Sequence, residues 1–161
     1  MPRLLIVYHS QTGGTRSLAD AAFAGAVTIP ETTTLMQRAA DTSPADVLAA
    51  DALLLGTPEY FGTMSGMLKD FFDRVFYPCE TAMTGRPYSV IVCAGGDGTG
   101  AMREVDRIVA GWRMRKIHPG VISRRIGGEA GSSRGDLDPV DIEGARTLGA
   151  TLAAGVAYGV F

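Results

Sequence analysis

Three short apolar runs constrain the fold of this chain more than any other feature. They are "LLIVY" at 4–8, "DALLLGT" at 51–57 and "YSVIVCA" at 88–94. Each run is continuous rather than alternating, which is typical of strands buried on both faces of a parallel sheet. Two weaker runs, "TTTLMQR" at 32–38 and "HPGVISRR" at 118–125, predict two further strands, the first of them in an outer position.

Helical patterns lie between these runs, at 15–26, 43–50, 65–76, 101–114 and 138–159. Ser43 followed by Pro44 is a strong helix-start signal. Strand and helix thus alternate five times, which predicts an α/β fold with a doubly wound, five-stranded parallel sheet in a single domain over 1–161. Residues 124–138 form the one long irregular stretch, which we interpret as a surface loop.

Composition excludes several classes of protein. The chain has 161 residues, of which 46% are hydrophobic and 20% charged, and this suits a folded domain rather than disorder. A net charge of −2 lacks the basic bias of a nucleic-acid partner, so we expect none. No apolar run reaches the length of a membrane span, and "MPRLLIVYH" lacks a secretory pattern, so we expect a cytoplasmic protein with no membrane span.

The two cysteines point to no metal site and no redox motif. Cys79 is expected in a loop and Cys93 in a buried strand, and they form no CxxC pair. No histidine cluster accompanies them, because His9 and His118 stand alone. We expect both thiols to be reduced, and we interpret His9 as a structural histidine rather than a catalytic one.

The loop after the first predicted strand has the composition of a phosphate cradle. In open α/β sheets, ligands collect at the carboxyl ends of the strands, and this loop supplies Ser10, Gln11, Thr12, Gly13, Gly14 and Thr15. Hydroxyls, an amide, flexible glycines and the free N–H groups of a helix start all suit an anion. Neither GxxxxGK[ST] nor GxGxxG is present, which disfavours a nucleoside triphosphate or a dinucleotide. Arg16 either adds charge or is solvated, and a plain capped turn is the alternative interpretation of the loop.

The loops after the third and fourth predicted strands suit a flat ligand. The earlier one contains Pro58, Glu59, Tyr60, Phe61 and Gly62, and its aromatic rings can flank a planar ring or pack in the core or at a subunit contact. The later one contains Ala94, Gly95, Gly96, Asp97 and Gly98, so a ligand can lie against its backbone. Thr99 is the expected cap of the following helix.

With these loops, the chain resembles the flavodoxin-like superfamily. The resemblance rests on the segments "SQTGGT", "GTPEYFGTMSGMLKDFFDR" and "AGGDGTG", which with their strands span most of residues 1–115. The resemblance is strongest to the FMN-dependent NAD(P)H:quinone oxidoreductases and flavin reductases, including the tryptophan-repressor-binding-protein-like group. It implies a strand order of 2-1-3-4-5 and one FMN, with residues 10–15 on the phosphate and residues 58–62 and 94–98 on the isoalloxazine ring.

The same resemblance implies a function. NADH or NADPH would reduce the flavin, which would pass electrons to a quinone or another small acceptor, and no catalytic side chain or metal is required. The later ring loop lacks an aromatic residue, and this favours an enzyme with an open flavin face over a flavodoxin-type electron carrier, which is the alternative. The oligomeric state stays open. The basic group Arg113, Arg115 and Lys116 either follows the helix dipole or docks a nicotinamide phosphate or an acidic partner.

Overall fold

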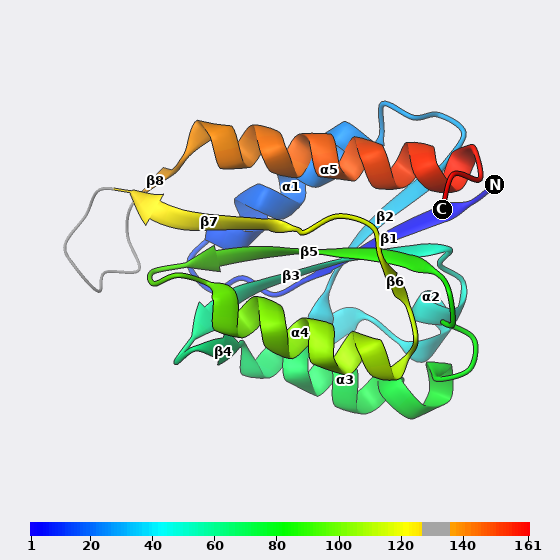
Figure 1. Cartoon of the computed structure of the whole chain (residues 1–161), viewed down its shortest axis with the longest axis horizontal. Helices are drawn as coiled ribbons and strands as arrows, with labels where there is room; N and C mark the ends of the chain where they lie inside the picture. The colour runs from blue at the N-terminus through cyan, green and yellow to red at the C-terminus, as the bar shows by residue number, and fades with distance from the viewer. Residues whose placement is uncertain (127–135) are drawn as a thin grey trace.

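The protein is a three-layer sandwich with a parallel sheet in the middle (Figure 1). The computed structural model describes residues 1–126 and 136–161. Helices α1 (Gly14–Ala26) and α5 (Pro139–Ala157) cover one face of the sheet, and α3 (Gly66–Cys79) and α4 (Thr99–Gly111) cover the other. The short helices η1 (Ala39–Asp41) and α2 (Pro44–Leu48) precede the third long strand.

Five long strands form the parallel sheet, in the spatial order β2 (Thr33–Arg38), β1 (Arg3–Tyr8), β3 (Ala52–Tyr60), β5 (Pro87–Ala94) and β7 (Val121–Ile126). In chain order these are strands 2-1-3-4-5, which confirms the predicted doubly wound topology. Three two-residue strands extend the sheet: β4 (Thr63–Met64), β6 (Arg115–Lys116) and β8 (Asp136–Leu137). Strands β4 and β8 pair antiparallel, so they do not disturb the parallel core.

The continuous apolar runs are explained by two cores, one on each face of the sheet. Every residue of β5 is buried, and successive side chains alternate between the two cores. Val90 and Val92 pack toward α3 and α4, whereas Ile91 and Cys93 pack toward α1 and α5. A strand covered on both faces has no solvent side and therefore no polar alternation.

Two local predictions are wrong. Cys79 is not in a loop but is the last residue of α3, fully buried, because that helix runs three residues further than its apolar pattern. Thr99 does not cap α4, since it is the first residue of the helix, and the Asp97 carboxylate accepts hydrogen bonds from its N–H and hydroxyl at 2.8 and 2.7 Å. Most of the predicted surface loop at 124–138 lies outside the described residues, but 124–126 extend β7 and 136–137 form β8.

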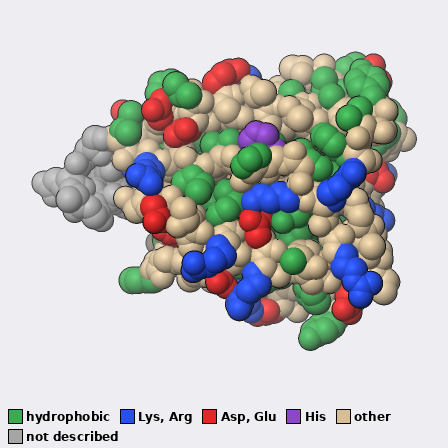
Figure 2. All heavy atoms as spheres, viewed as in Figure 1, with side chains coloured by type: hydrophobic (Ala, Val, Ile, Leu, Met, Phe, Trp, Pro, Cys, Tyr) green, Lys and Arg blue, Asp and Glu red, His purple; other side chains and the backbone are tan. Residues whose placement is uncertain are grey.

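The molecular face over α4 carries both signs of charge (Figure 2). Arg107 pairs with Glu104 at 2.9 Å, and Lys116 pairs with Asp106 at 2.6 Å. Lys116 belongs to β6, which joins the sheet at the amino end of β5 beside Tyr88. The predicted basic group therefore lies at the end of the sheet opposite the ligand loops.

Candidate functional site

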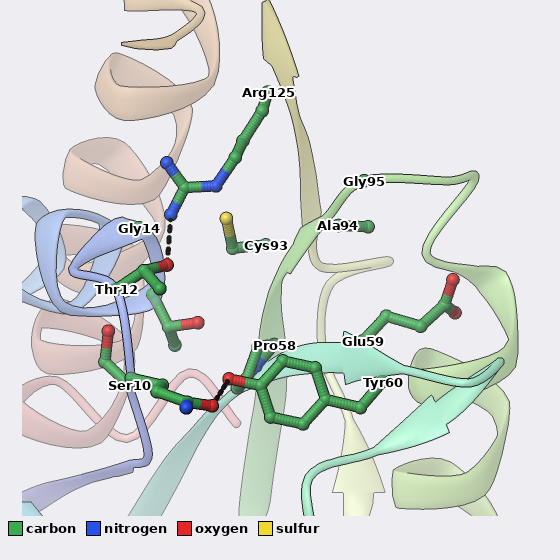
Figure 3. A pocket seen from close by; sticks show the side chains of 12 residues that line it. Ser10, Thr12, Gly14, Pro58, Glu59, Tyr60, Cys93, Ala94, Gly95 and Arg125 are labelled. Carbon is green, nitrogen blue, oxygen red and sulfur yellow. Dashed lines mark hydrogen bonds between the residues drawn. The ribbon is translucent and has the colours of Figure 1, made fainter. Parts of the chain in front are cut away.

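The three predicted ligand loops meet at the carboxyl ends of β1, β3 and β5, around a cleft of about 290 Å³ (Figure 3). Ten of its lining residues were expected from the sequence: Ser10, Gln11, Thr12, Gly14, Thr15, Pro58, Glu59, Tyr60, Ala94 and Gly95. Cys93 and Arg125 also line it. Gly13, Phe61, Gly62, Gly96, Asp97 and Gly98 belong to the same loops but stand outside the lining.

The first loop turns into α1 through a left-handed glycine. Gly13 has a φ of 97°, which favours glycine, and its N–H donates to the Ser10 hydroxyl at 3.2 Å. The first turn of α1 contains no acidic residue, so the positive end of the helix dipole is not neutralised within that turn. Thr15 is 1% exposed, and its Oγ1 has no hydrogen-bond partner among the described residues. A buried hydroxyl without a partner is costly unless a ligand or water completes it.

Gly14 is where this loop packs most tightly. A Cβ atom placed there would collide with Cys93 Sγ and would lie 2.7 Å from an Arg125 guanidinium nitrogen. Glycine is thus required by close approach and not by backbone conformation. The result is that the start of α1, the end of β5 and the end of β7 converge on one point.

Arg125 is the site residue that sequence reasoning missed. It extends from the end of β7 over the first loop and donates to Thr12 Oγ1 at 2.7 Å (Figure 3). Burial raises the pKa of the Cys93 thiol, and the nearby Arg125 guanidinium opposes that shift. Among the described residues that line the cleft, Arg125 is the one with a cationic side chain. Its positive charge suits the α1 end of the cleft to an anion.

The other end of the cleft is formed by the hairpin from β3 to β4 and by the loop after β5. The Glu59 carboxylate accepts from the N–H of Gly98 at 3.2 Å and from the N–H of Ala101 at 3.0 Å. This carboxylate therefore joins the two loops and satisfies N–H groups at the start of α4. Hydrogen bonds from Thr99 lower the pKa of Asp97, which caps the same helix from outside the cleft.

Two aromatic residues of the hairpin lie differently. Tyr60 lines the cleft, and its hydroxyl donates to Gln11 Oε1 at 2.9 Å, linking the hairpin to the first loop (Figure 3). Burial is the main cause that raises the pKa of Tyr60, so the phenol stays protonated and keeps donating. Phe61 has a φ of 53° and is fully exposed at the tip of the hairpin. Tyr60 thus forms an aromatic wall of the cleft, whereas Phe61 is an exposed aromatic residue beside it.

The cleft meets the chemical requirements of an FMN group. Its α1 end combines a helix N-terminus, a guanidinium and a buried hydroxyl without a partner, all of which suit a phosphate. Its other end offers Tyr60 and a loop of small residues as surfaces for a flat ring. Among the described residues, no group of three or more His, Cys, Asp or Glu side chains is placed to hold a metal ion.

Comparison of structures defines the class of protein first. A flavodoxin from the domain Archaea superposes with a TM-score of 0.78 at 17% identity, covering 96% of this chain and 98% of the other. The flavodoxin, WrbA-like protein from Agrobacterium tumefaciens superposes with a TM-score of 0.75 at 21% identity, covering 99% of each chain. At such identities the likeness establishes the fold alone, which is flavodoxin-like.

The family follows from the sequence. The family model of the NADPH-dependent FMN reductases matches residues 19–125, and the chain belongs to this family. The match begins after the first loop, so the assignment of residues 10–15 depends on their geometry. The description of the family and the name of the flavodoxin relative support FMN as the cofactor.

Two curated relatives differ in what their names describe. A flavodoxin of Aquifex aeolicus is 30% identical over 100 residues, which cover 62% of this chain and 54% of that protein. An NAD(P)H dehydrogenase (quinone) of Acidithiobacillus ferrooxidans is 31% identical over 94 residues, covering 46% of this chain and 47% of that protein. The chain thus spans about half the length of the curated relatives it matches. No helix in the described ranges is long and apolar enough to cross a membrane.

Proposed function

We propose that this protein is an FMN-dependent oxidoreductase that takes electrons from NADH or NADPH and gives them to a quinone or another small acceptor. The proposal treats residues 1–161 as one flavin-binding domain. The observation that carries it is the convergence of the α1 N-terminus, the unpartnered Thr15 hydroxyl and the Arg125 guanidinium at one end of the cleft.

Residues 10–15 and Arg125 would hold the FMN phosphate in this proposal. The N–H groups at the start of α1 donate to phosphate oxygens, and Thr15 Oγ1 gains the partner that it lacks. Arg125 adds a charge-assisted hydrogen bond from the opposite side of the loop. Residues 58–62 and 94–98 would hold the ring, with Tyr60 as its nearest aromatic neighbour.

FMN supplies the redox chemistry when bound, by accepting a hydride and passing electrons on. The protein's own part is to position the cofactor and to place donors near its ring. The Gly98 N–H is occupied by Glu59, so other N–H groups of the 94–98 loop would stabilise negative charge at the ring edge. The Tyr60–Gln11 bond fixes the distance between the phosphate loop and the hairpin. No side chain is assigned as an acid or base.

An electron carrier without NAD(P)H activity is the second candidate. It is favoured by the Aquifex aeolicus relative, which is called a flavodoxin and covers more of this chain than the quinone dehydrogenase does. The open ring end of the cleft favours the enzyme over the carrier. The loop 94–98 has no aromatic residue, and the Phe61 side chain is exposed to solvent, so neither would cover a bound ring. An uncovered ring is accessible to both a nicotinamide and an acceptor.

The location and partners belong to the same proposal. Cys79 and Cys93 are both free and buried, which suits a reducing compartment such as the cytoplasm.

We also propose that the protein self-associates through α3, where the apolar side chains of Met67 and Tyr77 are exposed.

Anaerobic reduction of the FMN-loaded protein tests the proposal. NADPH or NADH is added, and the visible absorption band of the flavin is followed in a stopped-flow instrument. Bleaching within seconds, reversed by a quinone, is the expected result. If FMN binds but neither donor bleaches it, the protein is an electron carrier. If FMN does not bind, the assignment of the cleft is wrong.

A further inference from the structure

The two edges of the parallel sheet differ in how they end. At one edge, β8 pairs antiparallel with β7 at Arg125 and Ile126. At the other edge lies β2, and within residues 1–126 and 136–161 no strand pairs with its outer side. An edge strand presents a row of backbone donors and acceptors to which another chain can add. The outer side of β2 is therefore a place where this sheet can be extended.

The backbone of β2 directs several hydrogen-bonding groups outward. The Thr33 N–H donates to the Pro2 carbonyl oxygen at 2.9 Å, so the backbone groups of Thr33 point toward β1. These groups alternate in direction along a strand, so those of Thr34, Met36 and Arg38 point away from β1. The Arg38 carbonyl accepts from Thr42 Oγ1 at 2.9 Å. The N–H and C=O groups of Thr34 and Met36 are thus the outward groups at the centre of the strand.

The sequence of β2 lacks the usual features that prevent edge pairing. Proteins block edge strands with prolines, lysines, bulges or very short strands. The strand has six residues, TTLMQR, without a proline or a lysine, and its one charge stands at the end. No residue from 33 to 38 has a left-handed backbone conformation. The strand is thus regular and long enough to pair.

An exposed apolar side chain stands at the middle of this edge. Leu35 is 42% exposed, and its registered neighbour on β1 is Leu5, which belongs to the same core as Val47 of α2. Leu35 therefore lies on the face of the sheet that carries α2. Leu48 of α2 is also exposed. A neighbour at this edge would remove apolar surface from water.

The two ends of β2 carry opposite charges. Glu31 precedes the strand and Arg38 ends it, and both are exposed. No carboxylate in the described part of the chain makes an ion pair with Arg38. A parallel copy would place like charges together, whereas an antiparallel copy brings Arg38 toward the segment that carries Glu31. Opposite charges across strands are stabilising and like charges are not. The charge pattern therefore matches an antiparallel second copy.

We propose that two copies of this chain pair antiparallel through β2, about a two-fold axis at Leu35. In this register Thr34 of each copy exchanges hydrogen bonds with Met36 of the other, and the two Leu35 side chains meet. The interface uses the same surface of both copies, and the two sheets become one continuous sheet. The flavin cleft lies at the ends of β1, β3 and β5, so pairing leaves it open. The inference does not depend on the proposed function, and its surface is separate from α3.

A cysteine at the two-fold axis tests the register. Residue 35 lies opposite its own copy in a pair without backbone hydrogen bonds, where Cα atoms are about 4.5 Å apart, close enough for a disulfide. We expect Leu35→Cys to form a covalent dimer under mild oxidation, seen on a non-reducing gel. Val140→Cys is the matched control, because Val140 is exposed at the start of α5, and it should stay monomeric on the gel. Cys79 and Cys93 are buried in both variants.

Opposite charges at the same position test the pairing without a covalent bond. Sedimentation velocity should show a dimer of the unchanged protein. Leu35→Lys and Leu35→Glu each place like charges opposite one another, and each should raise the dimer dissociation constant about tenfold or more. An equimolar mixture of the two variants should form a heterodimer, which native mass spectrometry resolves. Val140→Lys is the control, and circular dichroism reports that every variant is folded.

Four results would overturn the inference. The first is an unchanged protein that stays monomeric at every concentration. The second is a dimer that persists in Leu35→Lys and dissociates in Tyr77→Ala, which would place the contact on α3. The third is equal cross-linking of Leu35→Cys and Val140→Cys, which would indicate random collision. The fourth is a mixture of the Lys and Glu variants that stays monomeric, which would exclude contact at Leu35.

Discussion

The two ends of the cleft are built in different ways, although both lie at the same edge of the sheet. The α1 end is closed by packing: Gly14 has no room for a Cβ atom, Thr15 is buried, and Arg125 is tied to Thr12. The ring end is open. A Cβ atom on Gly95 would meet nothing within 4 Å, and Phe61 is fully exposed.

The difference separates two tasks. A crowded, charged end can fix one small anionic group, since few other groups fit there. An open end held by the Glu59 carboxylate leaves space for donor and acceptor to reach a ring in turn. We therefore expect affinity to depend mainly on the α1 end, and access to depend on the ring end.

Gly14→Ala should have the largest effect. Its Cβ atom would displace Cys93 or Arg125, and overpacking of this kind costs about 1–3 kcal/mol, which corresponds to roughly 5-fold to 150-fold in the dissociation constant of FMN. Quenching of flavin fluorescence on titration measures that constant. Gly95→Ala is the matched control, because its Cβ atom meets open space. Equal losses in the two variants would contradict the proposed asymmetry.

Arg125→Gln comes next in size. It removes a charge-assisted hydrogen bond at the phosphate, which should weaken FMN by about tenfold or more and leave riboflavin, which has no phosphate, unchanged. Affinity of the unchanged protein for FMN should also fall more steeply with added salt than that of the variant. Arg107→Gln, with the same loss of charge on α4, is the control. A parallel loss for riboflavin would place Arg125 at the ring.

Glu59→Gln should reduce stability by a smaller amount. An amide cannot accept at both positions, so the N–H of Gly98 or of Ala101 loses its partner, at a cost of about 1–2 kcal/mol in the free energy of unfolding. Urea unfolding of the cofactor-free protein measures the change. Glu143→Gln, on the exposed face of α5, should lie near zero. If the two variants are equally stable, Glu59 does not join the loops.

Phe61→Ala should have the smallest effect. If its ring flanks the flavin, the variant weakens FMN and riboflavin alike, by several-fold or about 1 kcal/mol. The free energy of unfolding should hardly change, because the side chain is exposed. Tyr77→Ala, which removes an exposed aromatic residue of α3, is the control for both measurements. Unchanged flavin affinity would take Phe61 out of the ring site.

The fold could be predicted from sequence because its strands are covered on both sides. All eight residues of β5 are buried, and the continuous apolar run at 88–94 reflects this burial. Strands β4, β6 and β8 have two residues each, which is too short for any periodicity. They arise from the turns of the chain around them and not from a pattern of their own.

The site could be predicted only where it is local. The first loop carries its own signals, since Gly13, Gly14 and the start of α1 are adjacent in the sequence. Arg125 lies 113 residues from Thr12, and its role depends on the register that pairs Cys93 with Ser123. The alternation of Val121, Ser123 and Arg125 was the available signal, because it places all three on the face that α1 covers.

The roles of the polar side chains in the ring loops could be assigned only from the tertiary structure. The sequence placed Glu59 in a ligand loop without a partner, but its two oxygens accept from the N–H groups of Gly98 and Ala101, about 40 residues away at the start of α4. Thr99 was predicted as the cap of a helix at 101–114, but the left-handed Gly98 is the N-cap, so the helix begins at Thr99 and the Asp97 carboxylate accepts from the Thr99 N–H. Hydrogen-bond partners at this distance leave no trace in local composition.

The unpartnered Thr15 hydroxyl links cofactor supply to the lifetime of the protein. Among the described residues nothing satisfies it, and a buried hydroxyl left without a partner costs about 1–3 kcal/mol, which a bound flavin phosphate would remove. A ligand that binds only the native state adds to stability with the logarithm of its free concentration. When flavin is scarce, a larger fraction of molecules unfolds and becomes available to proteases. The abundance of the protein would then follow the flavin that it needs in order to work.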